Sequence, residues 1–251
     1  DWVSIGIFTA CIIFPVSILL DGSLTKIERD RIFVIYIIAF FVIFFWAAYE
    51  QAGASLTLFA AEQTDRTILG WEMPASWIQS FNPFFVVILA AIMPSVWGAL
   101  NKRGMEPASP TKQAIGLLLL SLGYLVICFG VKDVQPGIKV SLIWLTGLYF
   151  IHTMGEIALS PIGLSMVNKL TPVRFASLMM GIWYLSTSTA NKFAGTLGGL
   201  YPEDGKVKTL LGFRIETMFD FFMVFVIMSG VASLILFLLS KKLQKMMHGV
   251  E

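Results

Sequence analysis

The chain has 251 residues, 57% of them hydrophobic and 14% charged, with a formal net charge of +2. Soluble domains are only about 45–50% apolar, so this composition indicates a membrane protein. The small net charge excludes a long-range basic field of the kind that recruits nucleic acid. The chain begins with Asp1, and no basic segment precedes its first apolar stretch, so we expect a fragment of a longer protein and not a signal peptide.

Seven apolar segments are long enough to cross a membrane as helices, which takes about 20 residues each. In chain order they cover residues 2–20, 32–61, 73–101, 113–131, 140–168, 175–202 and 221–240. The stretches that connect them are short and polar. The sequence therefore predicts an all-α membrane protein.

Basic residues in the connecting stretches predict the orientation of the chain. Successive connections lie on alternate sides of the membrane, which puts eleven basic residues on one side and six on the other. The positive-inside rule places the side with eleven in the cytoplasm. The C-terminus then lies in the cytoplasm and Asp1 lies outside. The larger group is Lys26, Arg29, Arg31, Lys102, Arg103, Lys112, Lys169, Arg174, Lys241, Lys242 and Lys245, and the smaller is Arg66, Lys132, Lys139, Lys206, Lys208 and Arg214.

The second segment, residues 32–61, contains Glu50 as its only formal charge. A carboxylate at membrane depth costs about 3 kcal/mol, so such an acid is usually functional, as a proton relay or part of an ion or substrate path. Trp46 precedes it by four residues and would share its helix face. The alternative is a structural carboxylate paired with a basic residue on a neighbouring helix. We favour the functional interpretation.

The third segment contains Asn82 followed by Pro83. A proline inside a helix removes one hydrogen bond and frees the carbonyl of Gln79, which needs another partner within lipid. Asn82 adds a donor and an acceptor at the same level. The pair predicts either a plain kink or a polar wall facing a cavity, and Pro94 a second bend.

The fifth segment, 140–168, has Glu156 as its only formal charge. His152, Glu156 and Ser160 recur at spacing four and are expected to form one polar stripe. Pro161 frees a backbone carbonyl beside them. This combination predicts a lined cavity, with His152 either relaying protons or simply bonded to a nearby carbonyl.

The sixth segment places Trp183 among small residues and ends in a glycine-rich run. Lys192, toward its outer third, is interpreted as a snorkelling side chain. We find no glycine-rich phosphate loop, no HExxH and no Cys/His spacing typical of a metal site in the sequence. We therefore expect neither an enzyme nor a bound metal.

Five stretches together are recognisable. The chain resembles the C-terminal half of the proton-dependent oligopeptide transporters of the major facilitator superfamily. The stretches occur in the family's order and spacing and are FFWAAYEQAGASLTLFA (44–60), QSFNPFFVVILA (79–90), NKRGMEPASPTK (101–112), GEIALSPIGLSMVNKLTP (155–172) and RFASLMMGIWYLST (174–187).

The resemblance implies a domain organisation. Residues 1–20 would be an extra membrane helix between the two halves of a bacterial member, and 21–31 a cytoplasmic linker. Residues 32–245 would form the six-helix bundle that matches the family's helices seven to twelve, with 246–251 as a cytoplasmic tail. The chain would lie in the bacterial inner membrane.

The resemblance also implies residue roles. Glu50 matches the acid linked to proton coupling and the outer gate, where several members have Asp. Glu156 matches the acid that faces the peptide's amino terminus. The remaining matches to the substrate site are Trp46, Asn82, Ser160 and Trp183. Lys192 departs from the apolar or aromatic residue expected at its position.

The expected function is proton-coupled symport of di- and tripeptides by alternating access, with protons as the coupling ion and no cofactor. The expected partners are the peptides, the lipid bilayer and the family's N-terminal half, whose acid–acid–arginine motif has no counterpart in this sequence. One alternative is a facilitator for nitrate, drugs or sugars, because fold does not fix substrate. A remote alternative is a seven-helix photosensor or receptor, which would require a Schiff-base lysine.

Overall fold

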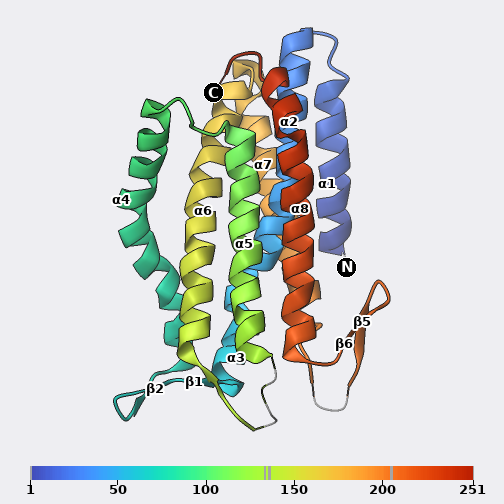
Figure 1. The fold of residues 1–251 in the computed structure, drawn as a ribbon. Helices are drawn as coiled ribbons and strands as arrows, with labels where there is room; N and C mark the ends of the chain where they lie inside the picture. Colours follow the sequence, from blue (N-terminus) through green and yellow to red (C-terminus); the bar gives the residue numbers. More distant parts are fainter. Residues whose placement is uncertain (1, 133, 135–136, 204–205, 251) are drawn as a thin grey trace.

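The fold is a bundle of long helices with short strands at one end (Figure 1). It is a computed structural model that describes residues 2–132, 134, 137–203 and 206–250. The ends of the expected first helix and tail, Asp1 and Glu251, lie outside the described residues. The helices are α1 (Trp2–Leu19), α2 (Lys26–Tyr49), α3 (Ser55–Glu62), α4 (Phe81–Lys102), α5 (Ser109–Val131), α6 (Leu142–Leu170), α7 (Ala176–Gly198) and α8 (Met218–Met246).

The shorter elements connect these helices. The 3₁₀ segments are η1 (Glu50–Gly53), η2 (Ala75–Ser80) and η3 (Val173–Phe175). The strands are β1 (Thr64–Asp65), β2 (Thr67–Ile68), β3 (Trp71–Glu72), β4 (Val140–Ser141), β5 (Lys208–Leu210) and β6 (Phe213–Ile215). They form three two-stranded pairs, namely parallel β1–β4 and the antiparallel hairpins β2–β3 and β5–β6.

Six helical stretches of the described chain are long and apolar enough to cross a membrane. They correspond to six of the seven predicted segments, and α7 corresponds to the remaining one. Helix α7 is not among the six because Ser, Thr, Asn, Lys and Gly occupy much of its length. The α1–α2, α4–α5 and α6–α7 connections and the C-terminus share one end of the bundle (Figure 1). The eleven basic residues of the larger group therefore lie toward that end.

Helix α2 begins earlier than the apolar pattern predicts, at Lys26 and not at residue 32. A capping box at Thr25 and Glu28 explains the difference, because each side chain satisfies a backbone N–H group of the other. Glu28 also pairs with Arg174 of η3 at 3.0 Å. The polar first turn thus projects beyond the apolar segment.

The apolar segment 32–61 forms a membrane-length helical stretch, but that stretch is not one continuous helix. Helix α2 ends at Tyr49, η1 follows, and Ala54 adopts a non-helical backbone (φ −125°, ψ −101°) before α3 starts. Glu50 still donates its backbone N–H to the carbonyl of Trp46, so the break follows directly after it. Glu50, Gln51 and Gly53 interrupt the apolar run only briefly, and the stretch Lys26–Glu62 as a whole stays apolar enough to cross a membrane, so its hydropathy does not reveal the break.

The buried side chain of Gln51 supplies hydrogen bonds around this break. Its amide nitrogen donates to the carbonyl of Ala47, one turn back, at 3.1 Å and to that of Ala194 on α7 at 2.9 Å. Its oxygen accepts from the hydroxyl of Ser55 at 2.7 Å. Gln51 therefore connects α2, α3 and α7. These bonds hold the break between α2 and α3 against α7.

Of the two alternatives at Asn82 and Pro83, the plain mid-helix kink is not observed, because Pro83 lies in the first turn of α4, after η2. A proline is tolerated there, since the N–H groups of the first turn have no helical partner in any case. Pro94 and Pro161 do lie inside helices, as expected. Asn82 is thereby placed at the beginning of a helix and not in its middle.

Helix α5 packs most extensively on α8 and α6. Glycines permit the α5–α6 approach, because a Cβ atom on Gly155 would lie 2.9 Å from the carbonyl oxygen of Gly116. Helices α2 and α7 pack together, α4 packs on α6, and α1 packs on α7. The site described next lies where α2, α4 and α6 meet.

Candidate functional site

The carboxylate of Glu156 on α6 receives hydrogen bonds from two neighbouring helices. The hydroxyl of Tyr49, the last residue of α2, donates to Oε2 at 2.5 Å. The amide nitrogen of Asn82 on α4 donates to the same oxygen at 2.9 Å. Both bonds fall on Oε2, which leaves Oε1 without a bond from either donor. Glu156 is half-buried.

Asn82 joins three side chains of this cluster. Its amide nitrogen also contacts the hydroxyl oxygen of Tyr49 and lies 3.3 Å from that of Thr153. An amide group has two hydrogens, so these three acceptors share them. Thr153 is buried and lies three residues before Glu156 on α6. Its hydroxyl donates to the carbonyl of Tyr149. We call Tyr49, Asn82, Thr153 and Glu156 the α2–α4–α6 cluster.

Aromatic rings hold Tyr49 in the cluster. Phe45 stacks on it with centroids 5.4 Å apart and an interplanar angle of 17°. Trp46, which is half-buried, meets the Tyr49 ring edge-on at the same distance. The structure thus connects the predicted site residue Trp46 to Glu156 through Tyr49.

Glu50 is exposed and opens the 3₁₀ segment η1 directly after Tyr49. It directly follows Tyr49, whose hydroxyl donates to Glu156, so the two acids lie near the same junction of α2 and α6. The two acids found in the sequence thus belong to one part of the bundle, contributed by α6 and by the break after α2.

His152 lies one turn before Glu156 on α6 and is buried. The residue is only 2% exposed. Its Nε2 atom lies 3.1 Å from the carbonyl oxygen of Leu120 on α5, and its ring centroid lies 4.7 Å from that of Tyr124. A Cβ atom on Gly123 would lie 2.3 Å from the His152 ring. Gly123 on α5 leaves the space that the ring occupies, and the ring also lies 6.2 Å from that of Tyr49, measured between centroids. The alternative of a carbonyl-bonded ring is confirmed.

Two other predicted residues lie apart from the α2–α4–α6 cluster. Trp183 on α7 is 5% exposed and packs on α6, where a Cβ atom on Gly163 would lie 2.6 Å from its ring. Ser160 is half-buried one turn beyond Glu156. The roles of both in a substrate site stay predictions.

The sequence interpretation missed Tyr49 and Thr153. Tyr49 precedes Glu50 within one of the recognised stretches, but its neighbours on α4 and α6 cannot be read from spacing along one helix. Thr153 lies three residues before Glu156, close to its helix face, which was the available signal.

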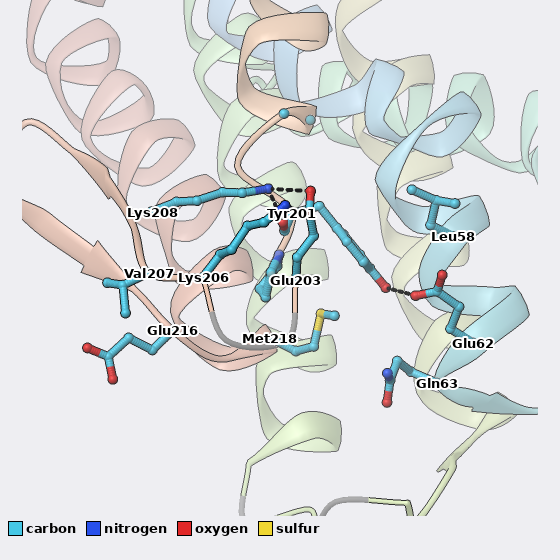
Figure 2. A pocket seen from close by; sticks show the side chains of 13 residues that line it. Leu58, Glu62, Gln63, Tyr201, Glu203, Lys206, Val207, Lys208, Glu216 and Met218 are labelled. Carbon is cyan, nitrogen blue, oxygen red and sulfur yellow. Dashed lines mark hydrogen bonds and ion pairs between the residues drawn. The ribbon is translucent and has the colours of Figure 1, made fainter.

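A separate hollow of about 940 Å³ lies at the end of the bundle that carries α3 and the β5–β6 hairpin (Figure 2). Tyr201 donates to Glu62 at 3.3 Å, and Lys208 donates to the carbonyl of Tyr201 and to Glu203. Hydrogen bonds from Lys206 and Lys208 lower the pKa of Glu203 to about 2. No member of the α2–α4–α6 cluster lines this hollow.

The described residues hold no group of three or more His, Cys, Asp or Glu side chains that could bind a metal ion. The cluster itself offers one carboxylate surrounded by hydroxyl and amide donors. Such a set is suited to holding an organic cation, because the donors orient the carboxylate without cancelling its charge.

The overall fold resembles that of solved transporter structures. The chain superposes on the structure of a mutant peptide transporter POT in complex with alafosfalin, with a TM-score of 0.85 and 29% identity over 99% of this chain and 49% of that one. It also superposes on a POT family transporter in complex with 5-aminolevulinic acid, with a TM-score of 0.80 and 27% identity over 94% of this chain and 46% of that one. The fold is therefore that of a membrane transporter of the major facilitator type.

Sequence comparison is more specific. The model of the POT family matches residues 9–211, so the chain belongs to that family. It is 37% identical to the peptide transporter YePEPT of Yersinia enterocolitica, over 73% of this chain and 36% of that protein. It is 30% identical to dipeptide and tripeptide permease A of Escherichia coli, over 87% of this chain and 43% of that protein. The chain spans less than half the length of either relative. The predicted family and fold class are confirmed.

Proposed function

We propose that this chain forms the C-terminal half of a proton-coupled symporter of di- and tripeptides, with Glu156 as the residue that binds the peptide's terminal ammonium group. The observation that carries the proposal is the Glu156 carboxylate, held by Tyr49 and Asn82 where three helices meet. A half-buried carboxylate binds a cation more strongly than a hydrated one does. The names of the relatives, which are permeases and transporters of peptides, support this substrate class.

Proton coupling is assigned to Glu50 in this proposal. Glu50 and Glu156 lie near the same junction, where their negative charges repel each other. An ammonium group at Glu156 removes part of that repulsion. Binding at one site and protonation at the other are then energetically linked, and the linkage is reciprocal. The position of Glu50 at the helix break lets the same event act on α3, the outer part of the broken helix.

The remaining features of the proposal concern the surroundings of the chain. The N-terminal half of the transporter would complete the peptide site, and alternating access would rock the two halves against each other. The protein would reside in the bacterial inner membrane with the C-terminus of this chain in the cytoplasm. The grouping of the eleven basic residues at one end of the bundle supports that orientation. No observation favours nitrate, drugs or sugars as substrates, or a photosensor.

Glu156→Gln in the complete transporter tests the assignment. The amide keeps the size of the side chain but loses the charge, so dialanine should bind at least about tenfold more weakly, which equals about 1.4 kcal/mol. Isothermal titration calorimetry measures this directly. Glu62→Gln, the same change at a carboxylate outside the cluster, should leave the affinity unchanged. Wild-type affinity in Glu156→Gln would remove Glu156 from the site.

A further inference from the structure

Tyr49 lies between the two acids Glu50 and Glu156, a position that the sequence pattern does not predict. It is the last residue of α2, its hydroxyl donates to Oε2 of Glu156, and η1 with Glu50 begins at the next residue. Phe45 and Trp46 contact its ring from the preceding turn, which restricts the ring to one position. The hydroxyl is therefore a fixed donor, and Glu156 adapts to it.

The chemistry of this contact explains why a fixed donor matters. A glutamate side chain has three rotatable bonds, and a ligand that binds to it must bear the entropy cost of ordering them. Two donors on Oε2 order the carboxylate before the ligand arrives. Tyr49 and Asn82 are neutral donors, so the negative charge remains available to a cation, which would approach Oε1.

We propose that Tyr49 is a positioning residue: its hydroxyl orients the Glu156 carboxylate so that Oε1 is presented to the ammonium group of the substrate. This inference rests on the proposed function of Glu156 as the ammonium-binding residue. It also makes Tyr49 a determinant of specificity, because an oriented carboxylate favours ligands with a free amine over those whose amine is acylated. The selectivity for a free amino terminus thus depends on a residue that need not touch the substrate.

Tyr49→Phe in the complete transporter removes the hydroxyl and keeps the ring with its aromatic contacts. We expect the KM for dialanine uptake to rise about tenfold, with the maximal rate within twofold of wild type. Inhibition of uptake by N-acetyl-dialanine, which lacks the ammonium group, should not change. A KM effect confined to the free-amine ligand is not the result of a general packing defect.

Tyr149→Phe provides the matched control. The hydroxyl of Tyr149 is buried and has no hydrogen-bond partner among the described residues, so its loss should leave the KM unchanged. A KM for Tyr49→Phe that stays within twofold of wild type would contradict the inference.

A double-mutant cycle separates this inference from the proposed function. If Tyr49 acts through Glu156, adding Tyr49→Phe to Glu156→Gln should change the affinity less than twofold. Independent, additive effects would overturn the positioning role. If Glu156→Gln weakens binding and Tyr49→Phe alone does not, only the positioning role fails. If Glu156→Gln itself leaves binding unchanged, the proposed function fails, and the inference fails with it.

Discussion

At the scale of single residues, Glu50 and Glu156 are both acids but differ in their surroundings. Glu156 is half-buried and receives two hydrogen bonds, which favours a carboxylate that stays in place and holds a cation. Glu50 is exposed and begins the break after α2, which favours a group whose protonation accompanies a change in the backbone. Only a group that changes protonation between states can link proton binding to conformation.

Glu50→Gln should therefore separate coupling from binding. In liposomes that contain the complete transporter, peptide counterflow without a gradient should persist, and uptake driven by an inward pH gradient should be lost. Glu156→Gln serves as the comparison, because it should weaken both processes. Concentrative uptake that survives in Glu50→Gln would contradict the assignment of Glu50 to the gating proton.

The energetic cost of a charge within lipid was enough to find both acids in the sequence. Their neighbours could not be found in the same way. Asn82 contacts Glu156 across 74 positions and Tyr49 contacts it across 107, and spacing along one helix contains no information about such contacts. The spacing of His152 from Glu156 was correct, but spacing could not show that Gly123 on another helix admits its ring into the α5–α6 interface.

At the scale of helices, the close approach of α5 and α6 depends on glycine. A methyl group on Gly155 would lie 2.9 Å from the carbonyl oxygen of Gly116, and a backbone atom cannot move aside as a flexible side chain can. Overpacking of this kind costs about 1–3 kcal/mol. The interface also supports the cluster, since Glu156 follows Gly155 directly.

Gly155→Ala should accordingly lower the midpoint of thermal unfolding in detergent, as followed by tryptophan fluorescence. Gly147→Ala is the control on the same helix, because its Cβ atom would meet Val126 at an ordinary 3.4 Å. Because alanine is a better helix former than glycine, Gly147→Ala should leave the midpoint of thermal unfolding unchanged or raise it slightly. Equal melting of the two variants would show that α5 and α6 can separate without cost.

The helices themselves followed from the apolar pattern, while their interruptions did not. All seven predicted segments contain a long helix, although α2, α5 and α8 begin a few residues before the predicted segments do. The break at residues 50–54 and the start of α4 at Phe81 were missed. Around both places the helical stretch as a whole is apolar enough to cross a membrane, and the interruption depends on side chains such as Gln51 that bond to another helix.

At the scale of the whole molecule, the bundle exposes many large apolar side chains along its length. Phe40, Phe84, Val87, Leu234 and Leu238 are each more than half exposed. Contact with lipid or with an N-terminal half would cover such surfaces, and both remain part of the proposal. The exposed acid Glu50 is better suited to facing an N-terminal half than lipid, because a carboxylate in hydrocarbon is costly.

The central claim is that this chain supplies one half of a proton-driven peptide pathway. It is tested most directly by uptake of a labelled dipeptide into liposomes under an inward pH gradient. Residues 1–251 alone should give no uptake above empty liposomes, and reconstitution together with the N-terminal half of the same transporter should restore saturable uptake. Saturable, proton-driven uptake by a demonstrated monomer of residues 1–251 would contradict the claim, because the site would then be complete without a second half.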